Sequence, residues 1–256
     1  MNRVGEKGLN NFGSKMEIIA CKNNNNIDVY FEEYNWIAYN KGYKEFKNGK
    51  IKCPYERRTY GVGYLGEGKY KAKVNNKATF FYEEWKGMLR RCYSKEYHKK
   101  EPSYIGCEVC EEWHNFQNFA DWCQKNYYKV DNDVMRLDKD IYNKNNKEYS
   151  EDNCFFVPNR INLLFNKSKN NKKSNLPIGV FEHTYKNNTK YKVSCRTYEE
   201  GSVYLGLYDT IDKAFEVYKE FKENYIKQVA DEYYFSNLIP KELWKAMYEY
   251  EVEITD

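Results

Sequence analysis

The chain has 256 residues, which is enough for more than one domain, since single domains commonly run to about 100–200 residues. Its net charge of +4 is too small to identify a nucleic-acid partner, because proteins that bind nucleic acid concentrate positive charge on one face. No stretch approaches the roughly 18 consecutive apolar residues of a membrane span, and residues 1–15 lack the apolar segment of a signal peptide, so we expect a cytoplasmic protein without a membrane partner.

The first 60 residues alternate short apolar runs with turn residues. Residues 15–46 read as a strand, an Asn-rich turn and a further strand, and "KNGK" follows as another turn. We therefore predict a β-rich N-terminal module over residues 1–60. In residues 60–74, "YGVGYLGEGKYKAKV", the pattern predicts a hairpin whose turn is "GEG".

Two helices are predicted next, because apolar residues recur there at helical spacing. In the segment 79–97 these residues are Phe81, Trp85, Met88, Leu89 and Cys92, and in 110–128 they are Trp113, Phe116, Phe119, Ala120 and Cys123. We expect both stripes to be buried. The order that follows is a strand at 135–141, a long turn, a short strand at 155–157 and a helix that Pro158 starts in its first turn.

Residues 167–177 form a polar, basic segment without apolar periodicity, which we interpret as a linker and a domain boundary. The lysines that cluster there are predicted to follow the phosphate backbone of DNA. They are Lys167, Lys169, Lys172 and Lys173.

Beyond the linker, residues 178–235 predict three strands separated by turns at "KNNT" and "EEGS", then a long helix opened by Asp209 and Thr210. The acidic residues 236–256 are predicted to form a tail that packs back onto the body through Leu243, Trp244 and Met247.

The segment 178–235 resembles the AP2 DNA-binding domain, on the strength of "IGV", "KYKVSCR", "VYLGLYDT" and the helix "DKAFEVYKEF". The resemblance implies a three-stranded antiparallel sheet that enters the major groove of DNA, with a helix packed on the opposite face. Strand alternation then places Tyr191, Val193 and Cys195 toward the helix. The outward set is Lys190, Lys192, Ser194, Arg196, Ser202 and Tyr204.

Those outward residues suit contact with double-stranded DNA. Arginine bridges guanine edges or clamps phosphate, lysine neutralises phosphate, and tyrosine lies against a sugar or a thymine methyl group. The alternative is that the charged residues only solvate an exposed sheet face. Phe181 and Ser194 stand where better-known members often have arginine or an acidic residue, so the family's base specificity is not transferred.

The central segment resembles phage and prophage proteins whose centre is related to HNH nucleases. The resemblance rests on "WKGMLRRCY", "YIGCEVCEEWHNFQNF", "LDKDI" and "YSEDNCFFVPNRINLLFN", within a predicted module at 61–166. It implies a ββα unit that holds one metal ion, here Mg²⁺ or Mn²⁺, and a histidine that deprotonates the attacking water. Position by position, Asp138 takes the acidic ligand position, Lys139 the histidine position, Asn153 the loop-closing position and Asn162 the helix ligand.

Lys139 argues against catalysis, because a lysine with its ordinary pKa near 10.4 is protonated at neutral pH and neither accepts a proton nor binds a metal. The flanking carboxylates of Asp138 and Asp140 favour that charged form further. His114 is the candidate to supply a base from elsewhere in the fold. A lone histidine beside Trp113 is more often a packing or surface residue.

The CxxC motif and a pair of arginines can each be interpreted in two ways. Cys107 and Cys110 form a CxxC that would need additional thiolates to bind zinc, and buried reduced thiols are the preferred interpretation for the eight cysteines. Arg90 and Arg91 follow the apolar stripe of their helix, either as clamps on the DNA backbone or as its ordinary solvated end.

These patterns predict a multidomain α+β protein of phage type that acts on double-stranded DNA in the host cytoplasm. Its favoured function is site-selective duplex binding with a degenerate HNH-like centre. One alternative is a metal-dependent HNH endonuclease of homing type. Another is an inhibitor or interaction module that binds a protein partner in a host nucleic-acid machine.

Overall fold

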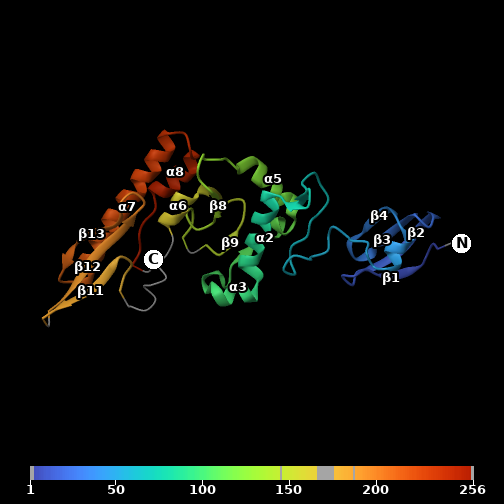
Figure 1. Ribbon diagram of the computed structural model, residues 1–256, viewed down its shortest axis with the longest axis horizontal. Helices are drawn as coiled ribbons and strands as arrows, with labels where there is room; N and C mark the ends of the chain where they lie inside the picture. Colours follow the sequence, from blue (N-terminus) through green and yellow to red (C-terminus); the bar gives the residue numbers. More distant parts are fainter. Residues whose placement is uncertain (1–2, 145, 166–175, 187, 255–256) are drawn as a thin grey trace. The chain divides into compact units, whose positions relative to one another are not determined.

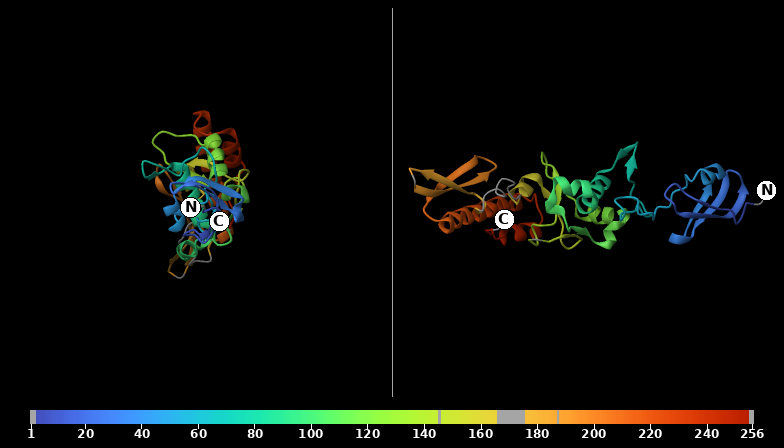
Figure 2. Two further views of the ribbon diagram at one scale, coloured as in Figure 1. Left: turned by 90° about the vertical axis from the view of Figure 1, so that its right-hand side faces the viewer. Right: turned by 90° about the horizontal axis from the view of Figure 1, so that it is seen from below.

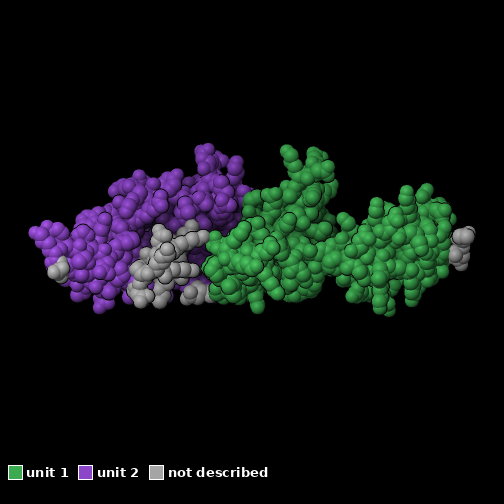
Figure 3. Space-filling view, turned by 60° about the horizontal axis from the view of Figure 1, so that its bottom comes forward, with its two compact units in different colours: residues 1–125, 147–151 green, residues 126–146, 152–256 purple. Residues whose placement is uncertain are grey.

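The computed structural model describes residues 3–144, 146–165, 176–186 and 188–254 (Figure 1). It contains helices and several separate sheets, which confirms the predicted mixture of α and β structure. The chain divides into two compact units, coloured separately in Figure 3. Unit 1 comprises Met1–Lys125 and Lys147–Glu151, and unit 2 comprises Asn126–Asn146 and Asp152–Asp256.

Unit 1 begins with a four-stranded antiparallel sheet whose strands pair in chain order (Figure 1). The strands are β1 (Lys7–Leu9), β2 (Lys15–Asn23), β3 (Asn26–Phe31) and β4 (Trp36–Lys41), and the short helices η1 (Glu32–Tyr34) and α1 (Tyr43–Lys47) accompany them. Ile27, Val29 and Phe31 alternate toward the core, where Phe46 of α1 joins them. The prediction of β structure in this part of the chain is confirmed.

The predicted hairpin with a "GEG" turn is wrong. Residues around Gly66 form an irregular loop instead, and the hairpin that follows joins β5 (Lys73–Val74) to β6 (Lys77–Ala78). Its turn is made by Asn75 and Asn76, which both adopt left-handed φ angles of 48° and 61°. Gln117 satisfies the loop's backbone, since its amide oxygen accepts from Tyr70 N–H and its amide nitrogen donates to Tyr70 C=O.

The two predicted helices are present, and both apolar stripes are buried in the core of unit 1, except for Phe81, which is only half-buried. The elements are α2 (Phe80–Tyr93), α3 (Lys95–Lys100), η2 (Pro102–Tyr104), β7 (Glu108–Val109), α4 (Glu111–His114), α5 (Phe116–Asn126) and β9 (Glu148–Tyr149). The second predicted helix is interrupted at Asn115, whose side chain accepts from the N–H of Gln117 and separates α4 from α5.

Unit 2 contains the predicted order of strand, loop, strand and helix. β8 (Met135–Asp138) pairs antiparallel with β10 (Phe155–Pro158), and α6 (Asn159–Leu164) follows at once with Pro158 at its N-cap. α6 packs against both strands, with Ile161 fully buried.

The C-terminal part of unit 2 is a three-stranded antiparallel sheet with a long helix along one face (Figures 1 and 2). Its elements are β11 (Val180–Tyr185), β12 (Asn188–Thr197), β13 (Gly201–Tyr208), α7 (Ile211–Phe235) and α8 (Lys241–Tyr248). Thr210 caps α7 by accepting from the N–H of Lys213, and Trp244 of α8 stacks on Tyr234 of α7. The predictions for this helix and for the tail are confirmed.

Arg160 ties α6 to the C-terminal part of unit 2. Its guanidinium donates to both carboxylate oxygens of Glu232, at 2.7 and 3.0 Å, and also bonds Glu199. It further lies over the rings of Tyr198 and Tyr233. The hydrogen bonds to Glu232 raise the pKa of Arg160 above its usual range, despite the opposing effect of burial. The ββα unit and the sheet with α7 therefore share one compact unit.

No helix among the described residues is both long and apolar enough to cross a membrane.

Candidate nucleic-acid interface

The middle strand of the C-terminal sheet, β12, sorts its side chains by strict alternation. Val193 and Cys195 are buried against α7, while Lys192 and Arg196 are exposed on the opposite face. Lys190 and Ser194 lie on that same outward face and are half-buried. The inward and outward assignments predicted for this strand are confirmed.

Strand β13 adds the other predicted outward residues. In the antiparallel register Ser202 is opposite Arg196, and Tyr204 is opposite Ser194, so the four side chains share one face. Tyr204 is 61% exposed, and the ammonium of Lys192 lies 5.8 Å from its ring centroid. Sequence alternation thus located a basic and aromatic surface correctly.

Sequence reasoning missed Leu207, because a β-bulge breaks the alternation of β13. The register shifts between Val193 and Ser194 of β12, so that one residue of β13 is left without a partner. Leu205 and Tyr208 both pack on the core, and Leu207 between them is exposed opposite Lys192. The available signal was the glycine in "LGL", since Gly206 adopts a φ of 131°.

Strand β11 contributes Phe181, which is also paired with Lys192 and is 45% exposed. We name the outward positions of the three strands the outer face. Its described members are Phe181, His183, Tyr185, Asn188, Lys190, Lys192, Ser194, Arg196, Ser202, Tyr204 and Leu207. None of these is acidic, although Asp209 at the end of β13 forms an ion pair with Lys190 at 2.9 Å.

Lys192 and Arg196 carry the unneutralised charge of the outer face, since neither has a carboxylate partner among the described residues. Lys192 makes its cation–π contact with Tyr204 only. An acid-free surface with exposed cations and aromatic rings is suited to a polyanion.

In the ββα unit, Asp138 stands at the end of β8 and Lys139 directly follows it. One carboxylate oxygen of Asp138 accepts from the backbone N–H groups of Asp140 and Ile141, at 2.9 and 3.0 Å. Burial and the neighbouring Asp140 raise the pKa of Asp138 above its ordinary value. One of the two carboxylate oxygens of Asp138 is therefore occupied by hydrogen bonds to the loop backbone.

Lys139 is buried, with 5% of its side chain exposed. Its ammonium donates to the carboxylate of Asp140 at 2.5 Å and to the backbone C=O of Asn146 at 2.6 Å. The amide of Asn146 donates in return to the C=O of Lys139 at 3.1 Å. The lysine thus fastens the two ends of the loop after β8, and it is the donor in both hydrogen bonds.

Asn162 lies half-buried in α6, and Asn153 lies in the loop before β10. A carboxylate such as that of Asp138 and an amide such as that of Asn162 carry oxygen atoms of the kind that Mg²⁺ and Mn²⁺ prefer. The donor types therefore fit a hard cation. Within the described ranges, no group of three or more His, Cys, Asp or Glu side chains is placed to hold a metal ion.

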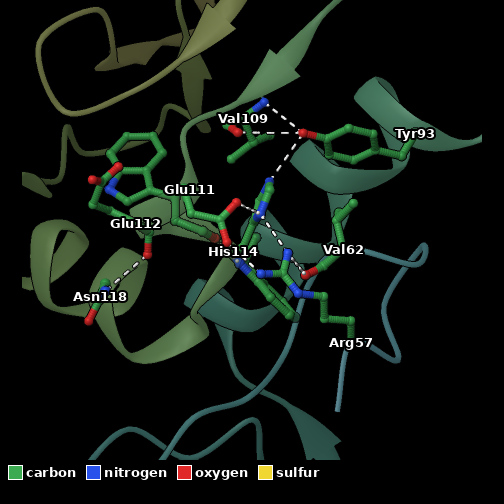
Figure 4. Close-up of polar contacts among 10 residues, drawn as sticks. Arg57, Val62, Tyr93, Val109, Glu111, Glu112, His114 and Asn118 are labelled. Atoms are coloured by element: carbon green, nitrogen blue, oxygen red, sulfur yellow. Dashed lines mark hydrogen bonds and ion pairs between the residues drawn. The ribbon is translucent and has the colours of Figure 1, made fainter. Parts of the chain in front are cut away.

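His114, the candidate substitute base, lies in unit 1 and has both ring nitrogens engaged (Figure 4). Nδ1 lies 2.9 Å from Glu111, and Nε2 lies 3.2 Å from the hydroxyl of Tyr93. Arg57 donates to the same Glu111 at 2.5 Å, and this hydrogen bond lowers the pKa of that carboxyl group. Such a closed network is typical of a structural histidine.

Arg90 and Arg91 occupy different environments at the end of α2. The guanidinium of Arg90 is exposed and lies 4.9 Å from the ring of Tyr97. Arg91 turns inward, where its Nε donates to the hydroxyl of Tyr149 at 3.0 Å. Burial opposes the charge of Arg91, but the nearby Tyr149 raises its pKa above the usual range. Of the two arginines, only Arg90 is exposed to solvent.

All eight cysteines are free thiols in the structure. Cys107 is buried, and burial raises the pKa of Cys110 to about 11. A thiol with so high a pKa is unreactive near neutral pH. Lys167, Lys169, Lys172 and Lys173 lie outside the described residues.

No family model matches this chain, and no curated protein or solved structure matches it either.

Proposed function

We propose that the chain is a phage-type, site-selective protein that binds double-stranded DNA through the outer face of its C-terminal sheet. The observation that carries this proposal is the acid-free outer face, on which Lys192 and Arg196 are exposed beside Tyr204. The sheet with one helix behind it supports the resemblance to AP2 domains. A two- or three-stranded sheet of this kind is one of the elements that enter the major groove.

Four residues of the outer face have roles in this proposal. Arg196, unpaired with any carboxylate among the described residues, would bridge the O6 and N7 atoms of a guanine or clamp a phosphate. Lys192 would neutralise a phosphate, and Tyr204 would lie against sugar or base. Lys190 would contribute less, because Asp209 already offsets its charge.

An electrophoretic mobility assay with short random-sequence duplexes tests the proposal. The full chain is expected to retard duplex DNA, and the Arg196→Ala, Tyr204→Ala double variant to bind it more weakly. Loss of one base-contacting arginine costs about 1–3 kcal/mol of binding free energy. Both side chains are exposed, so circular dichroism of the variant should match the wild type. Unchanged affinity in the folded variant would refute the role of the outer face.

A metal-dependent endonuclease is the second candidate, favoured by one observation. β8, β10 and α6 form a ββα unit in which Asp138 ends the first strand and Asn162 lies on the helix. In this candidate Asp138 and Asn162 would hold Mg²⁺ or Mn²⁺, which would stabilise charge on the scissile phosphate. Lys139 favours the degenerate alternative, since its ammonium is fixed between Asp140 and Asn146.

Cleavage of supercoiled plasmid separates the two candidates. We expect highly purified wild-type protein with Mg²⁺ or Mn²⁺ to leave the plasmid intact, because no base stands at the position of Lys139. Metal-dependent nicking that disappears in Asp138→Ala would establish the endonuclease instead.

A further inference from the structure

Two apolar side chains flank Lys192 in a row across the outer face. Phe181 of β11 and Leu207 of β13 are both paired with Lys192 of β12, and they are 45% and 39% exposed. Leu207 reaches this face only because of the bulge at Gly206. The fold thus places an aliphatic side chain on a surface that is otherwise basic, polar and aromatic.

Duplex DNA offers one apolar group to a surface that lies in its major groove. Phosphates and most base edges are polar, whereas thymine carries a methyl group on C5. Strands in a sheet are about 4.8 Å apart, so Phe181 and Leu207 are separated by roughly 10 Å. That distance corresponds to about three base-pair steps of 3.4 Å.

We propose that Phe181 and Leu207 are specificity-determining residues that contact thymine methyl groups, so that the outer face favours A·T pairs at two positions of its site. This inference rests on the proposed function, because it requires the outer face to lie in the major groove. Lys192 lies between the two apolar side chains and would neutralise a phosphate of the DNA backbone. Arg196 lies further along β12, beyond Ser194, and would contact a guanine or a second phosphate.

The row of Phe181, Lys192 and Leu207 is better suited to duplex DNA than to single-stranded DNA. Unpaired bases stack on exposed rings, and Leu207 has no ring to offer. An aliphatic side chain is matched instead by a methyl group that points into a groove. The absence of acidic residues from the described positions of the outer face, together with exposed Lys192 and Arg196, favours a polyanion over an apolar protein partner.

The test compares thymine with uracil, which lacks only the 5-methyl group. The full chain first selects its preferred site from a pool of short random-sequence duplexes, and the recovered duplex is then made with thymine or with uracil. Wild-type protein should bind the uracil form about fourfold more weakly for each methyl group that it contacts, given about 0.8 kcal/mol per buried CH₂ group. In the Phe181→Ser, Leu207→Ser variant the difference in affinity between the two forms should shrink by the same factor for each contact removed.

Phe235→Ser is the matched control, because it removes an exposed aromatic side chain from α7 in the same unit. It should keep the full difference between thymine and uracil. Equal binding of both forms by wild-type protein, with duplex binding intact, would overturn this inference alone. Failure to bind any duplex, or preference for a single strand, would overturn the proposed function as well.

Discussion

Lys139 shows how far a single residue can be interpreted from sequence. Its position in "LDKDI" predicted the loss of a general base, and its bonds to Asp140 and Asn146 supply a physical reason for a lysine there. A long cationic side chain reaches a backbone carbonyl across the loop, which an imidazole would not do in the same way. The sequence could not reveal this, since Asn146 lies seven residues away in a loop without periodicity.

We predict that Lys139→Met destabilises unit 2. The variant removes the charged hydrogen bond from Lys139 to the C=O of Asn146, and loss of such a bond costs about 1–3 kcal/mol of unfolding free energy. Urea denaturation followed by circular dichroism measures the change. Lys129→Met is the control, because that side chain is exposed and its pairing distance to Asp131 is 3.8 Å. Equal stability of the two variants would show that Lys139 does not fasten the loop.

At the scale of elements, hydrophobic periodicity predicted the helices and strands that pack a core on one face. The stripes of α2 and α5 and the inward side of β12 were found in this way, because burial imposes a regular spacing on them. The loop around Gly66 was not found, because side-chain bonds from Gln117 to its backbone determine its path. The bulge at Gly206 similarly depends on cross-strand register, which a single strand's sequence does not contain.

We predict that Gly206→Ala destabilises the C-terminal sheet more than Gly201→Ala does. Both glycines have positive φ angles, of 131° and 74°. A Cβ atom at Gly206 would lie 2.7 Å from the hydroxyl oxygen of Tyr208, whereas nothing lies within 4 Å at Gly201. We expect a loss of about 1–3 kcal/mol at Gly206, the usual range for such strain. Thermal unfolding of both variants measures which one loses more stability. A smaller loss in Gly206→Ala than in Gly201→Ala would contradict the strained backbone at the bulge.

At the scale of the whole molecule, the sequence predicted the residues of the outer face better than the environment of the polar side chains in the ββα unit. The outer face followed from alternation in β12, and six of its residues were named from sequence alone. The ββα unit was harder to interpret, because the hydrogen bonds of its polar side chains cannot be derived from the sequence. Asp138, Lys139 and His114 all have suitable neighbours for structural roles.

The central claim is that the outer face neutralises the phosphates of duplex DNA, and the salt dependence of affinity tests it most directly. Fluorescence anisotropy with a labelled duplex should show log affinity falling linearly with log salt for the full chain. Lys192→Gln should reduce the magnitude of that slope by about one, whereas Lys213→Gln, which removes the same charge from α7, should leave it unchanged. Absence of duplex binding, or the same slope in Lys192→Gln as in the wild type, would contradict the claim.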